Sequence, residues 1–266
     1  MEAIKAGLKE FFGFGPYLRE PEGWFSWQHL TFVTALMIIM TALAVYYGVR
    51  NKQRSEKDKN RVMIVSAILI DSLELFKIVM FCVRDNAPMD WVYNLPLFLC
   101  SIQLITIPLA AFSKGRVKEA SLDFVSIFGL LGAVMGTYLA TQNYGCYPVL
   151  CLDNVVSGIT HSISGFCALY ILIAGMASMK KKNIFITYCI LFSFGIAAYI
   201  ANIFTDKNYM FLLRGDGTPY DILYNLVGGN PVAYPIGVMA LFVGYIALFY
   251  WIYFLVTSKK SKKAPV

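Results

Sequence analysis

The segment from Trp27 to Gly48, WQHLTFVTALMIIMTALAVYYG, contains no charged residue over its whole length. A helix needs about 20 apolar residues to cross the hydrocarbon core of a membrane, so this segment is long enough to do so. The whole chain has a similar character: of its 266 residues, 58% are hydrophobic and only 15% are charged, and the mean hydropathy is +0.60. A soluble domain of this length needs more charged residues to cover its surface. The sequence therefore predicts an all-α, polytopic membrane protein.

Further apolar segments follow along the chain, and no loop between them is long enough for a second folded domain. We expect a single transmembrane domain over residues 1–266 with seven transmembrane helices, at about 27–48, 62–83, 93–113, 121–141, 157–178, 183–204 and 233–256. Residues 1–22 are amphipathic and mixed in charge, and they lack the apolar core and small-residue cleavage site of a signal peptide.

The basic residues predict the orientation of these spans. Of the 23 Lys and Arg residues, 16 fall on one side, in three short loops and in the tail Lys259–Lys263; six fall on the other side, and Lys77 lies inside a span. Because cytoplasmic loops of membrane proteins are enriched in Lys and Arg, the N-terminus is predicted outside and the C-terminus in the cytoplasm. We expect a multi-pass protein of a cell membrane, the bacterial plasma membrane. The net charge of +7 then reflects topology, and no nucleic-acid partner is expected.

The second predicted span carries Asp71, Glu74 and Lys77, each three residues after the last. Residues at this spacing share one face of a helix. Charges inside a membrane are costly and usually face a bundle interior or a wet cavity. One interpretation is a structural ion pair between Glu74 and Lys77 that locks the bundle. The other is a functional polar face.

Several polar side chains are predicted in the outer half of the membrane, which favours a polar cavity open to the outer leaflet. Cys100 lies seven residues into the third span, about 10 Å below its outer end at 1.5 Å per residue. Gln103 lies one turn later on the same face, and His161 and Asn202 lie near the outer ends of the fifth and sixth spans. Pro96 fits the first turn of the third span, whereas Pro108 is expected to kink it.

The six cysteines have different expected roles. Cys82, Cys167 and Cys189 fit the packing of a small apolar residue. Cys146 and Cys151 lie in a predicted outer loop, where they form either a disulfide or two separate thiols. The chain has no CxxC pair and neither histidine has a second ligand one turn away, so no metal is expected. The outer segment 205–232 mixes apolar and charged residues and is either a lid over the cavity or an interfacial loop.

Three short motifs suggest a relationship. The sequence contains Leu95-Pro96-Leu97-Phe98-Leu99-Cys100-Ser101, then His161 after a Gly-containing segment, and Asn208-Tyr209-Met210-Phe211-Leu212 after Asn202. In these motifs and their order, the chain resembles the YwaF-type family of bacterial integral membrane proteins, which has a eukaryotic relative described as a transmembrane phospholipid acyltransferase. The resemblance implies that Cys100 is an acyl-accepting nucleophile and His161 its partner. The family commonly has a histidine where this chain has Phe98.

Together, the residues and the resemblance predict a lipid acyltransferase that needs no cofactor. A thiolate at Cys100, formed by proton loss to His161, attacks the ester of an outer-leaflet phospholipid, and the acyl group then passes to a lysolipid or another lipid hydroxyl or amine. Oxyanion donors are expected from Gln103, Asn202 or Asn208, and Glu74 is expected to orient the histidine. The expected partners are the bilayer and its phospholipids.

Other classes of membrane protein are possible. A transporter or ion-coupled carrier would use the Asp71, Glu74 and Lys77 face, although no inverted repeat is detectable. A seven-span receptor shares the predicted topology, but the third span ends in Ala-Phe-Ser-Lys-Gly-Arg and not in Asp-Arg-Tyr. A retinal protein requires a lysine in the last span, and residues 233–256 contain none. A non-catalytic scaffold is the remaining alternative.

Overall fold

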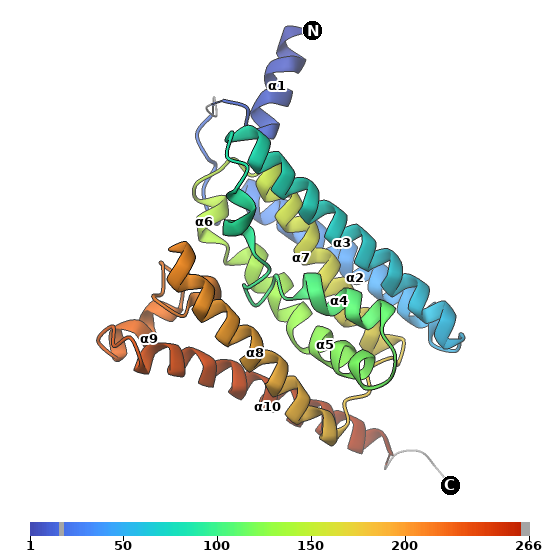
Figure 1. Ribbon diagram of the computed structural model, residues 1–266. Helices are drawn as coiled ribbons and strands as arrows, with labels where there is room; N and C mark the ends of the chain where they lie inside the picture. The colour runs from blue at the N-terminus through green and yellow to red at the C-terminus, as the bar shows by residue number, and fades with distance from the viewer. Residues whose placement is uncertain (16–18, 262–266) are drawn as a thin grey trace. The chain divides into compact units, whose positions relative to one another are not determined.

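The computed structural model describes residues 1–15 and 19–261, and all regular elements in that part of the chain are helical (Figure 1). By its internal contacts the chain divides into two compact units, one from Met1 to Met176 and one that begins at Ala177. The first unit contains α1 (Glu2–Phe12), α2 (Trp27–Asn51), α3 (Glu56–Arg84), the 3-10 helix η1 (Asp90–Asn94), α4 (Gln103–Phe112), α5 (Gly115–Tyr138), α6 (Thr141–Tyr144) and α7 (Leu152–Ile173). The second contains α8 (Lys181–Thr205), η2 (Tyr209–Phe211), α9 (Tyr220–Leu226) and α10 (Ala233–Ser261).

Within the described residues, five helical segments are long and apolar enough to cross a membrane. They are Trp27–Asn51, Gly115–Tyr144, Leu152–Ile173, Lys181–Thr205 and Ala233–Thr257. The protein is therefore an all-α polytopic membrane protein, as predicted. These five correspond to the first, fourth, fifth, sixth and seventh predicted spans. The tail Lys259–Lys263, on which part of the predicted orientation depends, includes Lys262 and Lys263, which lie outside the described residues.

The predicted continuous helix over residues 93–113 is wrong. The chain leaves η1 at Asn94, runs through an irregular segment, and becomes α-helical only at Gln103. The cause is local: Leu95 precedes Pro96, a position that disfavours helical backbone, and it is extended at φ −63° and ψ 146°. Helix α4 continues through Pro108 but has only 10 residues, about 15 Å, which is half of the hydrocarbon core.

The second predicted span is a single helix, α3, of 29 residues. At 29 residues, α3 is long enough to cross a membrane, but its middle carries Asp71, Glu74 and Lys77. For this reason α3 lacks the apolar composition of the other spans. Its charged side chains are sheltered by protein, because α3 packs against η1, α4 and α7.

Helix α7 lies at the centre of the first unit, in contact with α2, α3 and α5 (Figure 1). Small residues allow these helices to approach closely, as is typical of membrane helices. Gly129 of α5 lies against the Ser164 backbone, where an added β-carbon would be 2.7 Å from the carbonyl oxygen. Gly165 of α7 lies against Ala133, where an added β-carbon would be 2.7 Å from the alanine methyl. These contacts bring α5 and α7 close together near the middle of the two helices.

In the second unit, α8 packs against α10. The hydroxyls of Thr187 and Tyr250 lie 3.1 Å apart in this contact, and Gly195 leaves room for the side chain of Met239. The segment between the two helices folds into η2 and α9. It is therefore an ordered connection with its own short helices.

Candidate active site

Cys100 lies on the irregular segment that precedes α4, in a turn closed by two backbone hydrogen bonds. The amide of Ile102 donates to the carbonyl of Phe98 at 3.0 Å, and the amide of Gln103 donates to the carbonyl of Cys100 at 3.3 Å. The thiol is partly buried, and the Ser101 hydroxyl and the Cys100 amide both lie within reach of the sulfur. Non-helical backbone at membrane depth is tolerated only where protein or a wet cavity surrounds it. The Cys100 thiol is therefore carried by a turn, at the point where the predicted helix is interrupted.

His161 is held in one orientation by its own helix, α7. Its Nδ1 lies 2.7 Å from the backbone carbonyl oxygen of Ser157, one turn earlier. A carbonyl can only accept a hydrogen bond, so Nδ1 carries the proton and donates it. In the neutral ring, the lone pair is then on Nε2. This nitrogen is buried, and no described residue offers it a partner with ordinary hydrogen-bond geometry.

Helix α5 brings the thiol and the ring together along a glycine edge. Gly132 and Gly136 are one turn apart, and a β-carbon added to Gly132 would meet the Cβ of Cys100 at 3.4 Å. A β-carbon added to Gly136 would overlap Cδ2 and Nε2 of the His161 ring. The thiol and the ring are close enough to act on each other electrostatically. The two residues predicted as a pair therefore share one site, and the unprotonated nitrogen lies on the edge of the ring that meets Gly136.

The other histidine of the chain, His29, is different in every respect. Its Nδ1 accepts from the amide of Phe25 at 3.1 Å, and its Nε2 lies 3.0 Å from the carbonyl of Thr137, to which it donates. The ring is fully buried and stacks on Tyr144 with a centroid distance of 4.1 Å. Both nitrogens are therefore satisfied, and His29 has a structural role that ties α2 to the end of α5.

Glu74 and Lys77 form an ion pair of 2.7 Å in which both side chains are largely buried. Lys77 also lies near enough to His161 to act on it electrostatically. The Nδ1 atom of His161, which Glu74 was expected to orient, is occupied by the Ser157 carbonyl. Near the other end of the α3–α7 contact, Arg84 binds Asp153 at 3.2 Å.

The three amides predicted as oxyanion donors have distinct surroundings. Gln103 is fully buried; its Oε1 accepts from Thr106 at 3.1 Å, whereas its Nε2 has no hydrogen-bond partner among the described residues. Asn202 and Asn208 belong to the second unit. The Asn202 side chain bonds both the amide and the carbonyl of Tyr209.

Asn208 organises the loop that follows it. Its Nδ2 donates to the carbonyl of Arg214 at 2.6 Å and to Asp216 at 2.8 Å, and its Oδ1 accepts from the amide of Leu213 at 2.9 Å. Asn202 and Asn208 thus hold the start of the 205–232 segment in shape. Of the predicted amides, Gln103 is the one that follows the cysteine turn directly.

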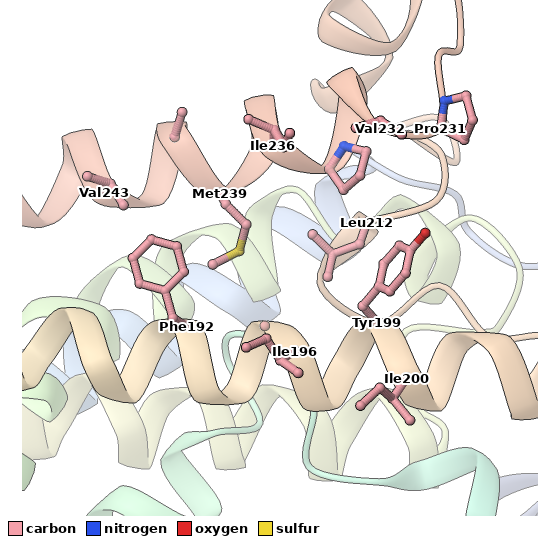
Figure 2. A pocket seen from close by; sticks show the side chains of 13 residues that line it. Phe192, Ile196, Tyr199, Ile200, Leu212, Pro231, Val232, Ile236, Met239 and Val243 are labelled. Atoms are coloured by element: carbon pink, nitrogen blue, oxygen red, sulfur yellow. The ribbon is translucent and has the colours of Figure 1, made fainter.

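The second unit contains an apolar cavity of about 650 Å³ between α8 and α10 (Figure 2). Phe192, Ile196 and Tyr199 project from α8 toward Ile236 and Met239 of α10. Leu212, from the 205–232 segment, also lines it. The cavity therefore suits hydrocarbon, and it lacks the polar groups that acyl transfer requires.

The remaining cysteines are present as thiols, and the loop before α7 contains two of them. Cys146 and Cys151 are separate thiols, the first exposed and the second buried. Of the two alternatives predicted for this loop, a disulfide or two separate thiols, the structure has the separate thiols. Within the described residues, no three His, Cys, Asp or Glu side chains are grouped to hold a metal ion.

Residues 24–259 match the TMEM164 family. The chain belongs to this family. The match spans all five apolar helices and includes both Cys100 and His161. No curated protein and no solved structure is detectably similar to the chain.

Three features of the site in this TMEM164-family protein were missed by sequence reasoning. The Ser157 carbonyl is a backbone group, so no residue type could indicate it. Gly132 and Gly136 were not predicted as part of the site, although their one-turn spacing fits a helix edge that faces bulky side chains. The break before Gln103 had a signal in Pro96, which was assigned instead to a first helical turn.

Proposed function

We propose that the protein is a membrane-embedded lipid acyltransferase with Cys100 as nucleophile and His161 as its base. The observation that supports this most is the buried imidazole of His161, whose Nδ1 is fixed by the Ser157 carbonyl, so that Nε2 is left to interact with the Cys100 thiol beside the ring. A buried nitrogen lone pair beside a thiol is positioned to accept its proton.

In the first half of the proposed reaction, the Cys100 proton passes to Nε2 of His161. The sulfur attacks the ester carbonyl of a phospholipid, so a carbon–sulfur bond forms and the carbon–oxygen bond to glycerol breaks. The imidazolium returns its proton to the leaving alkoxide, which becomes a lysolipid. The second half reverses these steps with an acceptor and regenerates the thiol. A covalent intermediate of this type needs a site that excludes water.

Gln103 is the best-placed donor for the oxyanion, because its amide nitrogen is buried and has no other described partner. Asn202 and Asn208 hold the start of the 205–232 segment in shape, and this proposal assigns them no step of the reaction. Glu74 keeps the Lys77 charge balanced beside the site. The predicted orientation would place the reaction in the outer leaflet.

The proposal is tested by mass spectrometry of the purified protein after incubation with phosphatidylcholine in detergent. We expect one acyl group on the peptide that contains Cys100, removable by hydroxylamine as a thioester is. The variant Cys167→Ser, altered at a buried thiol on α7, should acquire the same adduct. An unmodified Cys100, or equal modification of the other thiols, would contradict the proposal. Transport of labelled lipid by vesicles that contain such an unreactive protein would then support the carrier alternative.

A further inference from the structure

The apolar cavity of the second unit takes no part in the proposed reaction, yet it has the size and lining of a ligand site. Its volume is about 650 Å³, within the range of roughly 300–1,000 Å³ that is typical of ligand pockets. Of the 13 described residues that line it, only Tyr199 has a hydrogen-bonding side chain (Figure 2). Such a lining offers a polar ligand almost no partner, so it favours hydrocarbon.

Two contacts show how α8 and α10 run past the cavity. The hydroxyls of Thr187 and Tyr250 lie 3.1 Å apart, and further along α8 the side chain of Met239 lies against Gly195. The two helices are therefore antiparallel. The methionine reaches across the middle of the cavity, and because its side chain is flexible it can adapt to a chain that packs on it.

The lining residues give the cavity a length. Along α8 they run from Phe192 to Ile200, and along α10 from Pro235 to Val243. Each stretch has eight steps of 1.5 Å, about 12 Å in all. The chains of one leaflet fill half of the hydrocarbon core, about 15 Å. The cavity is therefore nearly as long as the chain region of one leaflet.

The space is too small for a helix of another chain to enter. A helix with its side chains is at least 10 Å wide, so a 12 Å length of it occupies roughly 940 Å³, which exceeds the 650 Å³ of the cavity. A hydrocarbon chain is much thinner than a helix. Ile196 and Ile236, one on each helix, are 62% and 63% exposed. The cavity is therefore open along its side, where a chain can enter from the bilayer.

The two ends of the cavity differ in their charged surroundings. Leu212, from the segment between the two helices, lines one end, and two residues later the exposed Arg214 forms an ion pair of 2.6 Å with Asp216. The other end lies between stretches of helix without charge, since residues 183–205 and 233–258 contain no charged side chain. A phospholipid has this same division, with its charges at one end of its chains. A headgroup that carries both signs complements an ion pair.

We infer that the second unit binds one zwitterionic phospholipid of the bilayer, with an acyl chain between α8 and α10 and the headgroup beside the 205–232 segment. Tyr199 lies toward the headgroup end, next to Leu212 (Figure 2), and tyrosine is enriched at this level of a membrane. The site consists of residues of the second unit alone. The inference therefore does not rest on the proposed acyl transfer at Cys100.

The first experiment is native mass spectrometry of the protein in a mild detergent, supplied with a diether phosphatidylcholine that has no ester for Cys100 to attack. Ala240 lines the cavity, whereas Ala247, seven residues later and only about 20° away around α10, does not. We expect wild type and Ala247→Phe to retain one lipid per chain. Ala240→Phe should retain about tenfold less, because the added ring fills the space of the chain.

Equal thermal unfolding midpoints of the two variants confirm that both are folded, as expected for an exposed alanine. Equal lipid retention by all three proteins would overturn the inference, whether or not Cys100 becomes acylated. Lipid-free dimers that Ala240→Phe dissociates would also overturn it, because they would assign the cavity to a second copy of the chain.

The second experiment tests the direction of the lipid without a substitution. The same diether lipid is prepared with a diazirine either near the glycerol or at the free end of a chain, and the cross-linked peptides are identified by mass spectrometry. We expect the first probe to label the Tyr199 and Leu212 end and the second to label the Phe192 and Val243 end, and excess unlabelled lipid should reduce both. The reverse pattern, or labelling that excess lipid does not reduce, would contradict a specific site of this orientation.

Discussion

Gly136 of α5 lies directly against the imidazole of His161, so close that a single added methyl group would overlap the ring at Nε2. This is the nitrogen that the proposed mechanism uses as a base. The glycine therefore sets the position of the ring from one side, while the Ser157 carbonyl fixes it from the other at 2.7 Å.

Gly136→Ala should consequently displace the ring and slow the acylation of Cys100. A misplacement of about 1 Å in a catalytic group can cost about 100-fold in rate, and we expect a loss of that order with normal expression. Gly132→Ala is the matched control, because its new methyl would meet Cys100 at an ordinary 3.4 Å. Acylation rates measured by mass spectrometry compare the two variants. Wild-type kinetics in Gly136→Ala would show that the ring position is unimportant.

Cys100→Ser and His161→Ala should each abolish acyl transfer, for different reasons. A serine hydroxyl is far less acidic than a thiol, whereas loss of the histidine leaves the thiol without its proton acceptor. Since the two residues act as one unit, the double variant should be about as defective as either single variant. Lipid acyl composition of cells that express each variant provides the measurement. Normal composition with Cys100→Ser would instead indicate that the cysteine only fills space.

Substitutions of the two histidines should affect different properties: stability for His29 and activity for His161. His29→Ala removes a ring that satisfies the Phe25 amide and the Thr137 carbonyl, and each buried group left unpaired costs about 1–3 kcal/mol. We expect a fall of several degrees in the midpoint of thermal unfolding in detergent. His161→Gln should change that midpoint much less and still lose acyl transfer. The reverse pattern, with an unstable His161→Gln, would assign the second histidine a structural role as well.

The Glu74–Lys77 ion pair should behave as a unit. Its side chains are only 16% and 14% exposed, and removal of one partner from a buried pair costs about 3–5 kcal/mol because the other charge is left uncompensated. Lys77→Met alone is therefore expected to destabilise the protein, whereas Lys77→Met with Glu74→Gln should recover most of the loss. Thermal unfolding of the three proteins in one detergent is the measurement. If the double variant is stable but inactive, the pair contributes to the reaction and not only to the fold.

Much of the fold was predictable, because length and hydropathy alone identify a membrane span. The segment that carries Cys100 was not, since its apolar length matched a span while Pro96 and the residue before it prevented helix formation there. The candidate site, too, was predictable only in part. Side-chain chemistry pointed to Cys100 and His161, but backbone groups and the empty space beside glycines have no signature in composition. Glu74 was expected to orient His161 as the acidic third member of a triad, whereas the Ser157 carbonyl, on the same helix as His161, holds that position.

The predicted orientation can be tested with the two thiols of the loop between α6 and α7. In single-cysteine variants, Cys146 is exposed and should react with an impermeant maleimide on intact cells, whereas Cys151 is buried and should react only after denaturation. Thr257→Cys, near the end of α10, should react only once the membrane is permeabilised. This pattern follows from the 16 basic residues on the side assigned to the cytoplasm. If Thr257→Cys but not Cys146 is labelled on intact cells, the topology is the opposite of the predicted one. The proposed reaction would then take place in the inner leaflet.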